Sequence, residues 1–287
     1  MNLKKWRLSD IFYLLPGFSI YSIFFLIPIG ICLYYSFTNW NGISDSYRFV
    51  GLDNFKLLFD DRFFIEALQT TLWMTLLFTL TVNVAGILIA AMLNNRSRAA
   101  KYSKTLFFIP AILSSVVVSF IWSYMTQTNG GIINLLLELV NIPPVDMFKT
   151  PLTITFMLSF VISWAAIGFY MTIYDTSIKS IPEELYEAAK VDGAGVVRQF
   201  FRITLPLLVP GITISSVFAI IFTLKQYDFV KIMTPGNVQT IAVYAVEQAF
   251  SYNMIGYSSA IVLALFVMIV IISGLQIFIL RKYKVEM

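Results

Sequence analysis

Six long stretches without a charged residue dominate the sequence and limit what it can fold into. They are residues 11–37, 67–93, 105–125, 151–174, 207–224 and 255–280. Each is close to the roughly 17–25 apolar residues that a helix needs to cross a bilayer. With 58% hydrophobic and 13% charged residues, the chain lies outside the composition of soluble globular proteins. The sequence therefore predicts an all-α membrane protein with six transmembrane helices in a single domain, residues 1–287.

Lysine and arginine are distributed unevenly over the segments that connect these stretches. If the N-terminus lies inside the cell, the inner segments hold 14 of the 20 basic residues. The positive-inside rule then places both termini in the cytoplasm. On this topology Lys101, Glu187 and Lys284 are cytoplasmic, whereas Asp53, Asp146 and Lys231 are external. Because topology accounts for the basic excess, the net charge of +4 gives no reason to expect a nucleic-acid partner.

A charged loop, about residues 175–206, interrupts the apolar pattern on the predicted cytoplasmic side. Ser180 and Glu183 have the spacing of a capping box, which marks the N-terminus of a helix. Asp192-Gly193 then supplies a C-terminal stop, because a left-handed residue is common at that position. We therefore predict one helix of about three turns in this loop.

The predicted loop helix has an apolar face. Ile181, Leu185 and Ala188 follow one another at spacings of four and three residues, so their side chains share one side of the helix. The adjacent Ala189 is too small to hold a neighbouring surface away. We expect this helix to dock closely onto a partner.

The loop also resembles the EAA loop of the membrane subunits of binding-protein-dependent ABC importers. Glu187-Ala188-Ala189 is followed after three residues by Gly193, and after nine more by Ile203-x-Leu205-Pro206. The Ile-Pro-Glu-Glu-Leu-Tyr run before it and Asp-Gly-Ala after it are similar to the carbohydrate branch of that family, the maltose and glycerol-phosphate type. The resemblance implies that the helix seats in a groove of a separate ATPase. The residues implied to make this coupling contact are Glu184, Leu185, Glu187, Ala188, Ala189, Asp192 and Gly193.

The resemblance further implies a fold and a set of partners. The fold is the type I ABC importer transmembrane domain, in the plasma membrane of a bacterium or an archaeon. The chain would form half of a translocation path with a homologous second permease subunit, or with a second copy of itself. A pair of ABC ATPase subunits would bind ATP and Mg, and an extracellular or periplasmic sugar-binding protein would deliver the carbohydrate. The sequence has no Gly-x-x-x-x-Gly-Lys-[Ser/Thr] motif, so we expect this subunit to be non-catalytic and to bind no cofactor itself.

A carbohydrate substrate needs apolar faces for its rings and polar groups for its hydroxyls. The resemblance places the substrate near mid-membrane, between the two permease subunits and in contact with the fourth and fifth spans. The candidates for this path are Phe222, Thr223, Gln226 and Tyr227. The aromatic residues would stack on the sugar and the other two would form hydrogen bonds. Helix packing or anchoring at the membrane interface would account for the same residues.

Two other classes of function are open to such a chain. An ATP-independent secondary transporter or channel usually places charged groups within the bilayer, and the six predicted spans contain none. Only a carrier that binds sodium through carbonyl groups would escape this argument. A membrane enzyme would need paired acids, an activated nucleophile or metal ligands at membrane depth, and none is visible. The chain has no histidine and one cysteine, Cys32, which excludes histidine-based metal ligation and an intrachain disulfide.

Overall fold

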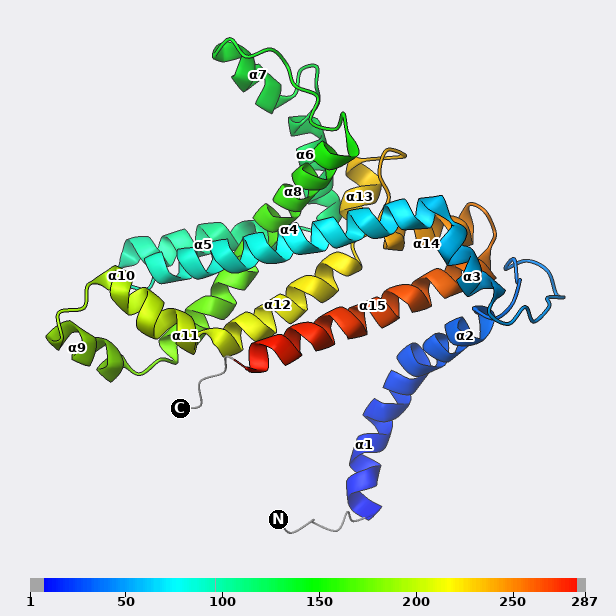
Figure 1. Cartoon of the computed structure of the whole chain (residues 1–287), viewed down its shortest axis with the longest axis horizontal. Helices are drawn as coiled ribbons and strands as arrows, with labels where there is room; N and C mark the ends of the chain where they lie inside the picture. Colours follow the sequence, from blue (N-terminus) through cyan, green and yellow to red (C-terminus); the bar gives the residue numbers. More distant parts are fainter. Residues whose placement is uncertain (1–7, 96, 283–287) are drawn as a thin grey trace. The chain divides into compact units, whose positions relative to one another are not determined.

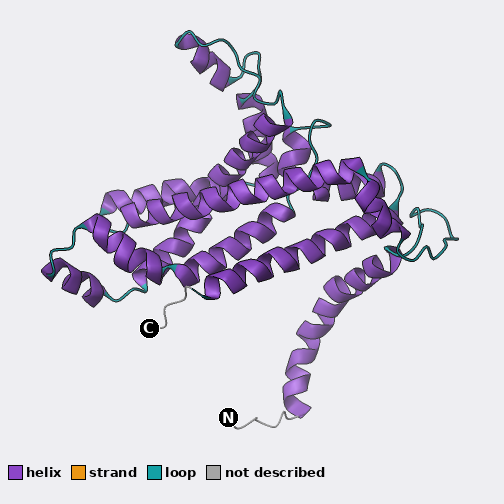
Figure 2. Cartoon of the chain, viewed as in Figure 1, coloured by secondary structure: helices purple, strands orange, loops and turns teal. Residues whose placement is uncertain are grey.

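The computed structural model describes residues 8–95 and 97–282, and most of them are helical, as Figure 1 and Figure 2 show. Within these ranges, β structure is limited to one isolated bridge between Thr38 and Phe49. The basic residues counted as cytoplasmic at Lys4, Lys5, Arg7, Arg96 and Lys284 lie outside the described residues. Over the described ranges, the prediction of an essentially all-helical chain is confirmed.

The helices follow one another with short connections. In order they are α1 (Leu8–Tyr21), η1 (Ser22–Leu26), α2 (Ile27–Tyr35), α3 (Asp53–Asp60), α4 (Arg62–Met92), α5 (Arg98–Ile112), α6 (Ser115–Met125), α7 (Ile132–Leu139), α8 (Pro151–Lys179), α9 (Glu183–Val191), α10 (Val196–Gln199), η2 (Phe200–Thr204), α11 (Leu205–Leu207), α12 (Val209–Leu224), α13 (Asp228–Met233), α14 (Ile241–Phe250) and α15 (Ile255–Arg281). The label η marks a π-helical segment, in which an N–H bonds to the carbonyl five residues earlier.

Contacts between residues divide the chain into two units. The first contains the described part of Met1–Arg62 together with Ala245–Ala264, and the second contains Phe63–Tyr244 and the described part of Leu265–Met287. Helices α14 and α15 each contribute residues to both units. All the candidate coupling and substrate-path residues belong to the second unit.

In the first unit, α1, η1 and α2 form one apolar helical path with a local irregularity. Pro28 has no N–H to donate to the carbonyl of Phe24, and its ring crowds that carbonyl. The chain widens into the π-helical segment η1 just before this proline, and the N–H of Ile27 bonds to the carbonyl of Ser22. The helix therefore accommodates Pro28 through a π-helical turn.

The segment that follows α2 folds against the start of α15 within the first unit. The N–H of Gly256 donates to the carbonyl of Trp40 at 2.9 Å. A Cβ on Gly256 would stand only 3.0 Å from the carbonyl carbon of Thr38, so glycine permits this close approach. The side-chain amide of Asn54 donates to the carbonyls of Ser36 and Thr38, both at 2.8 Å. The bond from Gly256 joins the N-terminal segment to the last long helix, and the two bonds from Asn54 tie α3 to the turn after α2.

In the second unit, α8 is the central helix. It packs against α4 and α12, and α5 runs alongside it (Figure 1). The core includes Phe78 from α4, Leu158 and Ile162 from α8, and Val230 from α13, all of them buried. Because α8 has little amphipathic character, it is suited to a position with other helices around it.

The predicted third span, residues 105–125, is wrong as one continuous helix. It is broken between α5 and α6, whose axes differ by 97°. Leu113 and Ser114 have extended backbones at the break, and the Ser114 hydroxyl caps α6 by accepting a hydrogen bond from the N–H of Val117 at 3.3 Å. Hydrophobicity did not reveal this break because the helices on both sides of it are apolar.

A second bend, of 65°, separates the helical run Val196–Leu207 from α12. It falls at Leu208, between Pro206 and Pro210, which have no backbone N–H to continue a regular helix. The predicted fifth span, residues 207–224, therefore corresponds to α12. Among the described residues, four single helices are long and apolar enough to cross a bilayer, and the count is six when each bent pair is taken as one span.

Candidate functional site

The second unit contains a cavity of about 820 Å³ at the place where α5, α6, α8, α12 and α13 meet. We call it the aromatic cavity. Its lining includes Phe108 and Ser115 from α5 and α6, Phe169 and Tyr170 from α8, and Phe218, Phe222, Lys225, Gln226, Tyr227 and Asp228 from α12, α13 and their connection. The bend between α5 and α6 also contributes Leu113 to the wall, so the break in the predicted third span helps to form the cavity.

Aromatic rings cover one part of the cavity wall. The ring centroid of Phe169 lies 6.4 Å from that of Phe218 and 5.4 Å from that of Tyr170, both edge to face. Phe222 packs at 5.5 Å against Phe78 of α4. Phe169 and Phe222 are still 44% and 41% exposed, so each keeps a ring surface that a ligand could cover.

Polar groups gather where α12 ends and α13 begins. Gln226 is buried, and its side chain is part of the cavity lining. Asp228 accepts a hydrogen bond of 2.5 Å from the hydroxyl of Ser115, which joins α13 to α6. Lys225 is exposed beside them. The cavity thus offers an amide, a carboxylate and an ammonium group next to its aromatic wall.

Three of the four predicted substrate-path residues lie together in this lining. They are Phe222, Gln226 and Tyr227. The fourth, Thr223, is buried outside the lining, and its hydroxyl donates to the carbonyl of Ala219 at 2.8 Å. The role of all four in transport stays a prediction.

Sequence reasoning did not select several other residues of the lining. Phe169 and Tyr170 are adjacent aromatic residues in the fourth predicted span, and Asp228 directly follows the selected run. Phe169 and Tyr170 lie shortly before the charged loop, and Asp228 is next to Tyr227. These positions in the sequence could have indicated that the three residues belong to the site. Phe108 had no such signal, because only the packing of α5 on α8 brings it to the cavity.

The predicted coupling helix, α9, ends in a Schellman motif around Gly193. The N–H of Ala194 bonds to the carbonyl of Ala189 at 2.8 Å, and the N–H of Gly193 bonds to that of Lys190 at 3.0 Å. Gly193 has a φ of +75°, in the left-handed region that favours glycine. The predicted left-handed stop is therefore confirmed.

The predicted start of this helix is wrong. Pro182 is the N-cap of α9, and the capping box between Ser180 and Glu183 does not form. Ser180 instead ends α8, and its hydroxyl donates to the carbonyl of Ser177 at 2.7 Å. The reason is that α8 continues to Lys179, beyond the predicted span, and this places Ser180 at a helix C-terminus.

No residue of α9 is buried. Of the predicted coupling residues, Glu184, Leu185, Glu187, Ala188, Asp192 and Gly193 are exposed and Ala189 is half-buried. Tyr186 links the helix to its neighbour, because its hydroxyl lies 2.9 Å from that of Thr204 in η2. Within the second unit α9 stands out from the long helices (Figure 1). Its apolar and acidic side chains are therefore open to a partner.

A buried polar cluster joins α4, α8 and α12. The hydroxyl of Tyr174 in α8 donates to the side-chain oxygen of Asn83 in α4. The hydroxyl of Ser216 in α12 reaches the same oxygen at 3.3 Å. One asparagine thus links three helices. This agrees with the packing role expected of polar side chains between helices in lipid.

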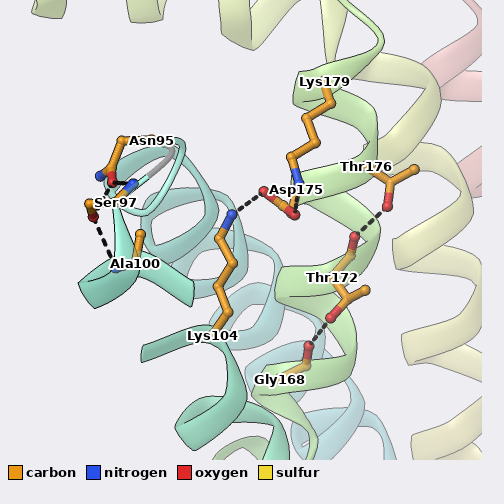
Figure 3. Close-up of polar contacts among 9 residues, drawn as sticks. All are labelled: Asn95, Ser97, Ala100, Lys104, Gly168, Thr172, Asp175, Thr176 and Lys179. Atoms are coloured by element: carbon orange, nitrogen blue, oxygen red, sulfur yellow. Dashed lines mark hydrogen bonds and ion pairs between the residues drawn. The ribbon is translucent and has the colours of Figure 1, made fainter. Parts of the chain in front are cut away.

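Asp175, the next residue of α8, pairs with two lysines (Figure 3). One carboxylate oxygen accepts from Lys104 of α5 and the other from Lys179 of α8, each at 2.7 Å. Sequence reasoning treated Asp175 only as the first residue of the loop. The spacing of four residues from Asp175 to Lys179 was a signal for the pair within α8, but nothing in the sequence indicated Lys104.

The family model described as the binding-protein-dependent transport system inner membrane component matches residues 82–285 of this chain. The matched range contains the helices that line the aromatic cavity and the loop that carries α9.

Curated relatives cover most of the chain. The multiple sugar-binding transport system permease protein MsmF of Streptococcus mutans is 32% identical over 267 residues, which cover 92% of this chain and 92% of that protein. The diacetylchitobiose uptake system permease protein NgcF of Streptomyces coelicolor is 32% identical over 262 residues, 84% of this chain and 73% of that protein.

A solved structure shares the fold. It is a bacterial alginate ABC transporter in complex with an alginate pentasaccharide-bound periplasmic protein, with a TM-score of 0.80 and 24% identity over 96% of this chain and 95% of that chain. This chain therefore shares the fold of the matched transporter chain. Because the family match extends over the cavity and the loop alike, the chain belongs to the family of binding-protein-dependent transport system inner membrane components.

Proposed function

We propose that this chain forms half of the translocation path of an ATP-driven carbohydrate importer. The observation that carries the proposal is the aromatic cavity, in which open ring surfaces of Phe169 and Phe222 stand beside the buried amide of Gln226. Aromatic faces stack on the apolar faces of sugar rings, and amides pair with sugar hydroxyls. The cavity volume of about 820 Å³ is in the range of small-molecule sites. Relatives named for sugar and diacetylchitobiose transport support the same substrate class.

Each predicted path residue receives a role from its position. Phe222 and Tyr227 stack on the sugar, and Gln226 donates and accepts hydrogen bonds with its hydroxyls. Thr223 supports Phe222 from within α12, because its hydroxyl is already bonded to the helix backbone. Packing of Phe222 on Phe78 is the alternative role for that ring.

Coupling to ATP is assigned to α9 and its C-terminal turn. Glu184, Leu185, Glu187, Ala188, Ala189, Asp192 and Gly193 contact one member of a pair of ABC ATPase subunits, which bind ATP and Mg. The exposure of α9 supports this role, since the chain leaves its surface uncovered. A homologous second permease subunit completes the path, and an extracellular or periplasmic sugar-binding protein delivers the substrate. This subunit itself is non-catalytic.

The proposed topology has six spans within one transmembrane domain and both termini in the cytoplasm of a bacterial or archaeal plasma membrane. Each bent helix pair counts as one span. Single cysteines at positions 101, 146 and 187, in protein carrying Cys32→Ser, test it. A membrane-impermeant maleimide added to sealed, right-side-out cells should label position 146 alone. Labelling at position 187 would overturn the orientation and the coupling proposal with it.

A reconstituted transport assay tests the function. The chain is coexpressed with its second permease, ATPase and binding protein, and uptake of labelled maltose, raffinose, diacetylchitobiose and xylose is measured in proteoliposomes, with glutamate as the non-sugar control. Uptake of at least one saccharide that requires internal ATP is expected. Uptake by this chain without any ATPase would instead identify the ATP-independent secondary transporter or channel.

A further inference from the structure

Asp175 is the point at which α8 is joined to α5 by charge. Its side chain is 13% exposed, and that of Lys104 is 20% exposed, so this pair is mostly removed from solvent. Lys179 is 59% exposed and lies on the same helix as Asp175. The two lysines therefore differ in role, since only Lys104 connects two helices (Figure 3).

The threonine and serine hydroxyls near Asp175 bond within α8, and the hydroxyl of Tyr174 bonds to α4. The hydroxyl of Thr172 donates to the carbonyl of Gly168 at 2.8 Å, and that of Thr176 donates to Thr172 at 2.9 Å (Figure 3). Ser177 likewise donates to Ile173. Asp175 is thus the residue in this stretch that bonds to α5.

The N-terminus of α5 is capped locally. The hydroxyl of Ser97 accepts from the N–H of Ala100 at 3.1 Å and donates to the side-chain oxygen of Asn95 (Figure 3). Neither bond reaches α8. Lys104 therefore provides the charged link between α5 and the end of α8.

A steric contact joins the same two helices further along. A Cβ on Gly168 would overlap the carbonyl of Phe107 and lie 2.6 Å from the Cα of Phe108, so the two backbones touch. Gly168 and Asp175 are seven residues apart on α8, a separation of about 10 Å along the helix. A pivot of α5 about Gly168 would therefore separate Lys104 from Asp175.

The α5 helix leads from this ion pair to the aromatic cavity. Lys104 is four residues before Phe108, which lines the cavity, and α5 ends at the bend that contributes Leu113 to the wall. On the other side, Asp175 lies in α8 shortly before the connection to α9. The pair therefore connects the end of α8 that leads to α9 with the part of α5 that leads to the cavity wall.

We propose that Asp175 is a positioning residue for coupling, which makes α5 follow the cytoplasmic end of α8 when the ATPase displaces α9. The wall of the aromatic cavity at Phe108 and Leu113 then moves with the coupling loop. This inference depends on the proposed function, because it requires an ATPase at α9. A fully exposed ion pair would carry little energy, but this pair is mostly removed from solvent, and separating α5 from α8 would leave the Lys104 ammonium without its carboxylate.

Two matched substitutions separate this role from simple stabilisation. Lys104→Gln removes the link to α5 and leaves Asp175 paired with Lys179, whereas Lys179→Gln removes the pair within α8 and leaves the link intact. Both variants are tested in the complete reconstituted complex. ATP hydrolysis is measured with and without the binding protein, which is loaded with the saccharide that the wild-type complex transports in the assay above. Lys104→Gln should lower the stimulation of ATP hydrolysis by the loaded binding protein about fivefold or more. Lys179→Gln should match the wild type.

A covalent link provides the rescue. Lys104→Cys with Asp175→Cys, in protein carrying Cys32→Ser, should lose stimulation in the same way, and a short bifunctional methanethiosulfonate reagent should restore it, because the tether replaces the ion pair. Equal stimulation in the two glutamine variants, or a tether that stops hydrolysis, would overturn the proposal. A wild-type complex that the binding protein does not stimulate would instead contradict the proposed function, so the two failures are distinguishable.

Discussion

The proposed coupling helix α9 and the aromatic cavity are held in shape by different means. α9 has no buried residue, and its C-terminal end is closed by two backbone bonds between residues of the same turn, around Gly193. The cavity takes its lining from α5, α6, α8, α12 and α13, which are distant in sequence and meet only through packing. The difference means that α9 can be altered without unfolding the chain, whereas the cavity depends on the contacts of its helices.

The two regions also differ in whether they need a partner molecule to be complete. Leu185 is 42% exposed on α9, so its apolar surface is complete only when a partner covers it. The cavity instead has its ring surfaces and polar groups within one chain, and a ligand would add to an existing site. Substitutions in the two regions should therefore fail in different measurements.

The largest effect is expected from Gly168→Val, which attacks packing and leaves α9 untouched. The added side chain would collide with the backbone of Phe107 and Phe108, and backbone atoms cannot move aside as a flexible side chain can. Overpacking of this kind costs about 1–3 kcal/mol or more. Folded protein, measured by thermal stability in detergent, should fall sharply. Gly274→Val is the matched control, because that helical glycine has open space around it, and equal stability of the two variants would contradict the tight contact.

The second effect concerns the local turn of α9. Gly193→Val places a β-branched residue at a φ of +75°, a strain of about 1–3 kcal/mol. Uptake should fall roughly tenfold while membrane abundance and thermal stability stay near normal. Gly195→Val is the control, since Gly195 has an extended backbone and open space for a side chain. Normal uptake by Gly193→Val would show that this turn is not needed for coupling.

A smaller effect is expected from a charge reversal on the surface of α9. Glu187→Lys changes an exposed side chain, so folding should be unaffected, but the proposed ATPase partner would meet the opposite charge. Uptake and stimulated ATP hydrolysis should fall together by about fivefold. Glu138→Lys on α7 reverses an equally exposed acid away from the coupling loop. If both variants behave alike, Glu187 has no specific role.

The smallest effect is expected in the cavity. Phe222→Ala removes one ring surface from the proposed path, and an aromatic contact contributes about 0.5–1.5 kcal/mol beyond its buried area. The KM for saccharide uptake should rise about threefold, with membrane abundance unchanged. Thr223→Ser keeps the hydroxyl bonded to the helix backbone and should leave KM unaltered. A rise in KM for Thr223→Ser but not for Phe222→Ala would place the path on the other side of α12.

Much of the secondary structure followed from sequence alone. The predicted spans 67–93, 151–174 and 255–280 agree with α4, α8 and α15, apart from the ends. Composition and length sufficed there, because a long uncharged apolar run has few alternatives to a helix in lipid. The C-terminal end of α9 followed as well, since Asp192-Gly193 acts on the backbone next to it.

Tertiary structure alone decided the break at Leu113 and Ser114, because a hydrophobic run on both sides of a bend has the same composition as a straight one. It also decided that α8 continues to Lys179, which made Ser180 the end of one helix and not the start of the next. The lining of the cavity and the pair between Asp175 and Lys104 were likewise beyond the sequence. Periodicity and spacing report on neighbours along the chain, whereas these features join residues that only the packing of separate helices brings into contact.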